Sequence, residues 1–263
     1  MDMGFLGVGH MGMAVLEGVL ASGMVDAKAV LAVDHEARRR ERASTLGCQV
    51  SADAADVRGL PMIVLCTRPQ SFAEAAEELR SDGDRLLVSV MAGVESARIA
   101  AACGLGSRVV RAMPNAPAAV GKGMTAIAAG AGARAGDLDR AAELFSGVGR
   151  VVEVAESSMH AVTAVSGSGP AWFYLLAEAI REEGMALGLE ASVAEALIRG
   201  TMEGAAAMMG GDSRSPAELR DAVTTPGGTT EAGLEAMRAN GLVNAVRAGV
   251  QAACRRSEAL SDG

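Results

Sequence analysis

The first residues of the chain carry the pattern that most restricts its fold. The apolar run Met3–Gly7 leads directly into Gly-Val-Gly-His-Met-Gly at residues 7–12, and an amphipathic segment follows from Met13. In a G-x-G-x-x-G turn the glycines permit a tight bend, close approach of a phosphate and close helix packing, while the helix N-terminus attracts anions. The pattern predicts a strand–turn–helix that binds a dinucleotide pyrophosphate through Gly7, Val8, Gly9, His10, Met11 and Gly12.

Up to about residue 155, short runs of β type alternate with helical segments. The β-type runs are Met3–Gly7, Ala29–Val33, Met62–Cys66, Leu86–Val90, Val109–Met113 and Val151–Val154. The helical segments between them include Met13–Ser22, Glu36–Leu46, Ser71–Leu79 and Ser96–Ala102. This alternation predicts an α/β fold with a mostly parallel, doubly wound sheet, to which Gly121–Gly130 is expected to add a strand near the edge.

After residue 156 the β-type runs stop and every segment has helical character. The helical segments are Ser157–Val165, Ala171–Leu187, Ser192–Met209, Pro216–Val223, Thr229–Asn240 and Leu242–Leu260. The helix over 171–187 is apolar on most sides, which is typical of a helix buried in a bundle or against another subunit. We therefore predict two domains, a dinucleotide-binding domain at 1–156 and an all-α domain at 157–263 that makes a homodimer or a higher homo-oligomer.

Charge and cysteine usage exclude several classes of partner. The net charge is −8, and the longest basic stretch is Arg38-Arg39-Arg40, which argues against nucleic acid and acidic membrane surfaces as partners. Four scattered cysteines form no CxxC pair, so neither a zinc site nor a disulfide framework is expected, and no metal is expected at all. With no signal-peptide pattern and no uninterrupted membrane-length apolar run, the expected location is the cytoplasm.

Asp34 bears on which dinucleotide is bound. It ends the second β-type run, where a carboxylate can accept hydrogen bonds from the adenosine ribose and repel a 2′-phosphate, which favours NAD over NADP. The alternative is a helix N-cap, because a charged helix begins at Glu36. Arg38, Arg39 or Arg68 remains available to hold a phosphate, so the residues alone leave the choice open.

Further cofactor contacts are expected from the loops that follow later strands, because ligands of an open α/β sheet lie across the carboxyl ends of its strands. One such loop is Cys66-Thr67-Arg68-Pro69 and another is Ala92-Gly93. The alternative for Arg68-Pro69 is a plain turn at the end of a strand.

Two clusters of small residues, 166–170 and 224–230, each immediately precede a helix. The second, Thr-Thr-Pro-Gly-Gly-Thr-Thr, provides hydroxyls and a run of backbone N–H groups at a helix N-terminus, which is an arrangement that binds anions. A substrate carboxylate fits there, although either cluster taken alone also fits a simple capping loop.

Four segments, in this order, resemble the pyrroline-5-carboxylate reductase family over essentially the whole chain. They are Gly7–Gly12, Arg111–Pro117, Ala164–Ala171 and Pro216–Leu234, and Pro-Gly-Gly-Thr-Thr at 226–230 is the most specific part. The resemblance implies a Rossmann domain, a helical substrate-binding and dimerisation domain, and hydride transfer from NAD(P)H to the cyclic imine 1-pyrroline-5-carboxylate, the last step of L-proline synthesis. By position, it implies that Asn115 contacts the cofactor, that Thr230 hydrogen-bonds the ring nitrogen, and that the substrate carboxylate is held by Thr225, Gly227, Gly228 and Thr229.

The family resemblance implies NADP(H), but the chain departs from the family at informative positions. Asp34 and Asp53 stand where NADP-using relatives often carry Ser and Asn, which keeps NAD(H) open. Thr67-Arg68-Pro69 stands where the family commonly has Val-Lys-Pro, and it retains a cation.

Imine reduction requires little acid–base catalysis by the protein, because a protonated cyclic imine is already an electrophile. Alignment of the reacting carbons can contribute about 7–11 kcal/mol, and Thr230 is the one residue expected to act catalytically, by orienting or helping to protonate the nitrogen. The rival interpretation is a β-hydroxyacid dehydrogenase, a class of enzyme that uses a lysine of the second domain as its general acid–base group. This chain has only Lys28 and Lys122, and neither lies in the second domain. A nucleotide sensor without chemistry would not need the 224–230 loop.

The three histidines are not expected to serve as the catalytic base. His10 and His35 belong with the phosphates and the ribose of the nucleotide, and His160 is expected to be a packed or surface helix residue.

Overall fold

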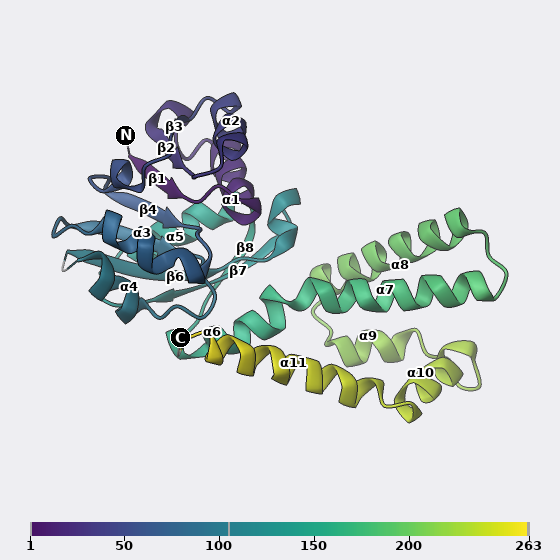
Figure 1. Cartoon of the computed structure of the whole chain (residues 1–263). Coiled ribbons are helices and arrows are strands. Elements are labelled where there is room, and N and C mark those ends of the chain that lie inside the picture. Colours follow the sequence, from purple (N-terminus) through teal and green to yellow (C-terminus); the bar gives the residue numbers. More distant parts are fainter. Residues whose placement is uncertain (1, 105, 262–263) are drawn as a thin grey trace. The chain divides into compact units, whose positions relative to one another are not determined.

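The computed structural model describes residues 2–104 and 106–261, which form two compact units (Figure 1). Unit 1 comprises Met1–Pro170 together with Ala252–Gly263, and unit 2 comprises Ala171–Gln251. Packing therefore groups residues 157–170 and the last twelve residues with the first unit. The predicted division of roles at residue 156 stays a prediction.

Unit 1 is built on an eight-stranded sheet in the order β3-β2-β1-β4-β5-β6-β7-β8. Its strands are β1 Met3–Leu6, β2 Val30–Val33, β3 Gln49–Ser51, β4 Met62–Leu65, β5 Arg85–Ser89, β6 Ser107–Met113, β7 Gly123–Ala129 and β8 Gly149–Glu153. Every neighbouring pair is parallel except β6 and β7. The mostly parallel, doubly wound sheet is thus confirmed, and β7 lies next to the edge strand β8, as expected.

Helices cover both faces of the sheet, so the central strand β4 is buried on both sides and all four of its residues are apolar. One core, which includes Met62 and Val64 of β4, lies against α1 His10–Ala21, α2 Ala37–Thr45 and α5 Asp137–Ser146. The other core takes the alternate residues Ile63 and Leu65 and lies against α3 Phe72–Leu79 and α4 Ser96–Cys103. Strand β3 and helix α5 lie outside the predicted segments. β3 is short and largely exposed, so it lacks the apolar run that identifies a buried strand.

A buried arginine joins the segments at the start of β5. Arg85 is 2% exposed, and its guanidinium donates to the carbonyl oxygens of Arg58 at 3.0 Å, Leu79 at 2.6 Å and Cys103 at 2.7 Å. These carbonyls lie at the ends of the 3-10 turn 54–57, α3 and α4, where helices leave acceptors unpaired and favour a cation. Burial lowers the pKa of Arg85.

The end of the chain returns to unit 1. After β8 come a 3-10 turn at 156–158, α6 Met159–Val162 and a π-helical turn at 163–167. The ring Nδ1 of His160 lies 3.0 Å from Oγ of Ser257, which is 2% exposed, in the last turns of α11 Leu242–Ala259. A Cβ on Gly93, after β5, would lie 2.7 Å from Cβ of Leu260, so the loop after β5 packs directly against the chain end.

Unit 2 is entirely helical, as predicted. Its helices are α8 Ala191–Gly211, α9 Pro216–Ala222 and α10 Thr229–Ala239, together with most of α7 Gly169–Ala186 and the first part of α11. Large apolar side chains of this unit are more than half exposed within one chain: Phe173, Tyr174, Leu175, Leu187, Leu197, Met208, Val223 and Val246. Among the described helices, none is both long enough and apolar enough to span a membrane.

Replacing Arg85 by Met is expected to lower the free energy of unfolding by about 3 kcal/mol, because several buried carbonyls lose a charged donor at once. Urea unfolding followed by circular dichroism measures the change. Arg85→Lys, which keeps the charge and loses the fork of donors, should fall between the wild type and Arg85→Met. A loss below about 1 kcal/mol for Arg85→Met would contradict the role assigned to the guanidinium.

Candidate functional site

The turn between β1 and α1 has the geometry that its glycines predict. Gly7 has φ +89°, and a Cβ there would lie 2.9 Å from the carbonyl oxygen of Cys66. A Cβ on Gly12 would collide with the carbonyl oxygen of Gly7, so only glycine lets α1 begin this close to the strand. A Cβ on Gly9 would instead point toward Arg39, with Nη1 3.6 Å away, on the side where a ligand can approach.

The N-terminus of α1 is arranged to receive an anion. Helix α1 begins at His10 with Gly9 as its N-cap. In the described structure no side chain caps this end, and its first turn has no acidic residue. The first N–H groups and the positive end of the helix dipole therefore remain available.

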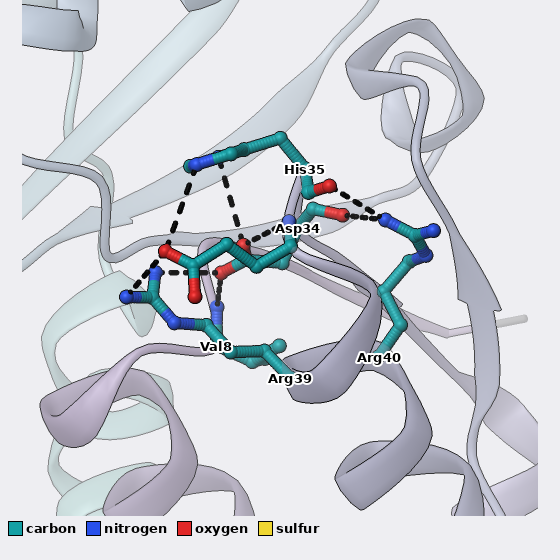
Figure 2. Close-up of polar contacts among 6 residues, drawn as sticks. Val8, Asp34, His35, Arg39 and Arg40 are labelled. Carbon is teal, nitrogen blue, oxygen red and sulfur yellow. Dashed lines mark hydrogen bonds and ion pairs between the residues drawn. The ribbon is translucent and has the colours of Figure 1, made fainter.

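Asp34 ties this turn to the end of β2 (Figure 2). Its side chain is 2% exposed. Oδ2 accepts a hydrogen bond from the N–H of Val8 at 2.9 Å, and Oδ1 accepts one from the N–H of Glu36 at 3.0 Å. The carboxylate is therefore a structural link between the glycine turn and the start of α2, in addition to any contact with a ribose. The proposed contact stays a prediction.

Charged side chains surround Asp34 in Figure 2. Arg39 places Nη1 3.5 Å from Oδ2 of Asp34 and Nη2 2.8 Å from Oε1 of Glu36. Arg40 donates through Nη1 to the backbone carbonyls of Asp34 at 2.7 Å and His35 at 2.9 Å. The His35 ring lies 3.6 Å from Oδ1 of Asp34 and 3.8 Å from Oε1 of Glu36.

A pocket of about 550 Å³ opens between the glycine turn and α2. Its lining residues come from both segments: Val8, Gly9, His10, Met13, Glu36, Arg38, Arg39, Glu41, Arg42 and Thr45. The pocket brings predicted pyrophosphate residues together with Arg38 and Arg39, two of the three arginines considered for a phosphate. Glu36 was not among the predicted site residues, although its spacing of three from Arg39 on a helix indicates an ion pair.

The loops after β4 and β5 lie beside the glycine turn and beside each other. The N–H of Cys66 donates to the carbonyl of Leu6 at 2.8 Å, and the hydroxyl of Thr67 donates to Sδ of Met91 at 3.4 Å. Burial raises the pKa of the Cys66 thiol to about 12, so this thiol is neutral at physiological pH. Arg68 is exposed at the start of the 3-10 turn 69–71.

Several other predicted residues also have structural partners. Gly93 packs against the end of α11, and Asp53 is an exposed cap whose Oδ1 accepts from the N–H of Ala55 at 2.8 Å. Asn115 accepts from the N–H of Met124 at 2.9 Å and donates to the carbonyl and hydroxyl oxygens of Ser166, both at 3.4 Å. The cofactor contacts assigned to Ala92, Gly93 and Asn115 stay predictions.

The loop 224–230 belongs to unit 2, whereas the glycine turn belongs to unit 1. Residues 225–228 form a β-turn with Pro226 second, Gly227 third at φ +71°, and a hydrogen bond from the N–H of Gly228 to the carbonyl of Thr225 at 2.9 Å. This is a type II turn, which requires a residue tolerant of positive φ at the third position. The turn places Thr229 and Thr230 in the first turn of α10.

Glu231 is a member of this loop that the sequence analysis missed. Its Oε2 accepts from the N–H of Gly227 at 2.7 Å, so one of the expected anion donors already has a partner. The signal was present, since an acidic residue in the first turn of a helix commonly reaches back to a preceding N–H. The N–H of Gly228 is also used, by the carbonyl of Thr225, so the donors left for a carboxylate in this described loop include the N–H groups and hydroxyls of Thr225, Thr229 and Thr230.

The residues of unit 1 fit a dinucleotide. Gly9 leaves the pocket side of the turn open where a side chain would stand, and the adjoining helix end favours a phosphate. Asp34 lies at the end of β2, where an acidic residue can hydrogen-bond the adenosine ribose.

Comparison with known proteins gives consistent matches. A family model described as pyrroline-5-carboxylate reductase dimerisation matches residues 156–260, and one described as NADP oxidoreductase, coenzyme F420-dependent, matches residues 2–93. A pyrroline-5-carboxylate reductase of Synechocystis is 37% identical over 98% of both chains.

Two solved structures are similar to this chain over almost its whole length. A pyrroline-5-carboxylate reductase from Coxiella burnetii has a TM-score of 0.90 at 30% identity and covers 99% of this chain and 98% of its own. A Plasmodium falciparum pyrroline carboxylate reductase with NADP bound has a TM-score of 0.89 at 25% identity, with the same coverage.

Replacing Asp34 by Ala is expected to lower the free energy of unfolding by about 2–4 kcal/mol, because the buried N–H of Val8 and the partly buried N–H of Glu36 both lose their acceptor. Asp34→Asn, which keeps one acceptor oxygen, should cost less. The matched control is Asp53→Ala, which removes an exposed cap and should cost about 1 kcal/mol or less. Equal losses at the two positions, measured by urea unfolding, would show that Asp34 has no special structural role.

Proposed function

Because the chain belongs to the pyrroline-5-carboxylate reductase family, we propose that it reduces 1-pyrroline-5-carboxylate to L-proline with a reduced nicotinamide dinucleotide. The observation that carries the proposal is the presence on one chain of two sites: the open glycine turn with its anion-binding helix end, and the Thr-Thr-Pro-Gly-Gly-Thr-Thr loop at a second helix end. A dinucleotide-binding protein without chemistry has no use for the second site.

The residues of unit 1 would hold the cofactor, and the bound reduced dinucleotide supplies the hydride. Gly7, Gly9 and Gly12 shape the turn that receives the pyrophosphate, and the N-terminus of α1 stabilises its charge. Asp34 fixes the position of Val8 within that turn. The loops at Cys66–Pro69 and Ala92–Gly93 border the same end of the sheet, where the rest of the cofactor is expected.

In unit 2, the loop Thr225–Thr229 would hold the substrate carboxylate. The type II turn and the Glu231 contact fix the backbone at Gly227 and Gly228 before substrate arrives, so little ordering remains to be done on binding. Thr230 would hydrogen-bond the ring nitrogen and thereby orient the imine carbon. Orientation can contribute much of the rate enhancement where the electrophile needs no further activation.

We propose that both NADH and NADPH serve as cofactors. The pocket beside Asp34 contains carboxylates, which disfavour a 2′-phosphate, and arginines, which favour one. With these charges close to balance, the two cofactors should differ in kcat/KM by less than about tenfold, or about 1.4 kcal/mol.

The exposed apolar side chains of unit 2 support a homodimer formed through the C-terminal helices. The family model that matches this region is described as a dimerisation domain, which indicates a homo-oligomer. Leu175 is 64% and Leu197 55% exposed in the single chain, and such a concentration of exposed apolar residues is characteristic of an interface. A cytoplasmic location also fits, because all four cysteines are free thiols.

Purified protein should oxidise NADH and NADPH when 1-pyrroline-5-carboxylate is present, followed at 340 nm, and should form proline. Thr230→Ala should lower kcat/KM for the imine at least about tenfold, as expected for loss of one hydrogen bond to a charged group. Thr230→Ser keeps the hydroxyl and is the control that should retain most activity.

The KM for the dinucleotide should be the same in both Thr230 variants as in the wild type, because unit 1 is unchanged. Absence of turnover with either dinucleotide would refute the proposed reaction. Unchanged kinetics in Thr230→Ala would refute only the role of that hydroxyl.

The double variant Leu175→Glu/Leu197→Glu should shift the protein to a monomer in size-exclusion chromatography with light scattering, because each burial of a Leu side chain contributes about 1.5–3 kcal/mol. Val120→Glu is the matched control, since Val120 is an apolar residue of unit 1 that is 73% exposed. An oligomeric mass retained by the double variant would place the interface elsewhere.

A further inference from the structure

The guanidinium of Arg39 lines the pocket beside the glycine turn. It is 3.6 Å from the position of a Cβ on Gly9, and it also faces the carboxylate of Asp34 at 3.5 Å. An acidic residue at the end of β2 marks the place of the adenosine ribose. Arg39 therefore lies where a guanidinium would bind the 2′-phosphate of that ribose.

Arg39 is held in that position by carboxylates. Its shortest ion pair, at 2.8 Å, is with Glu36, whose side chain is 45% exposed at the rim of the pocket. Asp34 is buried and holds two backbone N–H groups, so it is part of the framework of the turn. Glu36 is not part of that framework. Its side chain accepts no backbone hydrogen bond in the described structure, so it can be changed without breaking the turn.

The neighbouring arginines do not substitute for Arg39. Arg40 donates to two backbone carbonyls and does not line the pocket. Arg42 lines the pocket but pairs with Glu17 at 2.6 Å. Arg38 lines the pocket and has no ion pair among the described residues, so a change at Glu36 frees no guanidinium there.

We propose that Glu36 lowers the affinity of the pocket for NADP(H) relative to NAD(H): by pairing with Arg39, it withholds that guanidinium from the 2′-phosphate of NADP(H). A 2′-phosphate must compete with Glu36 for Arg39 and is repelled by the Glu36 charge, whereas the neutral 2′-hydroxyl of NAD(H) meets neither cost. A charge that opposes one ligand and spares the other creates specificity without any added attraction. The inference rests on the proposed dinucleotide site and deepens it.

The test is calorimetric binding of two fragments that differ only in the 2′-phosphate, adenosine 2′,5′-bisphosphate and 5′-AMP. In Glu36→Gln, the bisphosphate should bind about fivefold more tightly, the gain expected when a phosphate takes over a partly exposed guanidinium. The affinity for 5′-AMP should change less than about twofold. The NADPH/NADH ratio of kcat/KM should rise by a similar factor.

Two variants make the result specific to this pair of residues. Glu36→Gln/Arg39→Gln should lose the gain, because the effect passes through Arg39. Glu74→Gln removes the same charge from the first turn of α3, on the other face of the sheet, and should leave both affinities unchanged.

The inference is overturned if both fragments gain equally in Glu36→Gln, which would mean that Arg39 serves a group the two share. It is also overturned if neither fragment changes, or if the gain survives in the double variant. Selective tightening of the bisphosphate without turnover of 1-pyrroline-5-carboxylate would uphold the role of Glu36 and refute the proposed reaction.

Discussion

The buried carboxylate of Asp34 is the interaction on which the nucleotide site depends. It joins the turn after β1 to the residues after β2 by accepting from Val8 and Glu36, two N–H groups that are far apart in the sequence. The carboxylate is almost fully buried, and so is its hydrogen bond to Val8, so an unpaired N–H at Val8 would be costly. The start of α2, and with it the position of every arginine of the pocket, follows from this one side chain.

Local sequence patterns predicted the parts of the structure that are locally determined. The runs for β1, β2 and β4 and the glycine turn follow from apolar run length and backbone conformation, so they were found directly. Strand β3 was missed because its pairing with β2 decides its conformation and its own residues are mostly exposed. The same distinction between local and tertiary determinants applies to the site. The glycines were predicted, and the contact of Asp34 with the N–H of Glu36, two residues on, is local. The contact of Asp34 with Val8 and that of Gly93 with Leu260 depend on tertiary packing that no spacing reveals.

The run Arg38-Arg39-Arg40 shows why a charge pattern does not define a function. The three neighbours have three different surroundings: Arg38 lines the pocket, Arg39 pairs with carboxylates, and Arg40 donates to backbone carbonyls. Helical geometry separates them, since consecutive residues point in different directions around the axis. In an acidic chain, a few arginines can therefore form a local anion site without any general affinity for anions.

The return of α11 to unit 1 makes unit 2 an insertion with two covalent attachments, one at each of its ends. The chain leaves the nucleotide-binding unit through α7 and comes back through α11, whose last turns pack on the loop after β5 through Ser257 and Leu260. The segment from Ala252 to Ser261 is thus part of the N-terminal fold. During synthesis, unit 1 cannot complete its packing until the residues that follow Gln251 have left the ribosome, so the helical segment is made before the domain that precedes it is finished.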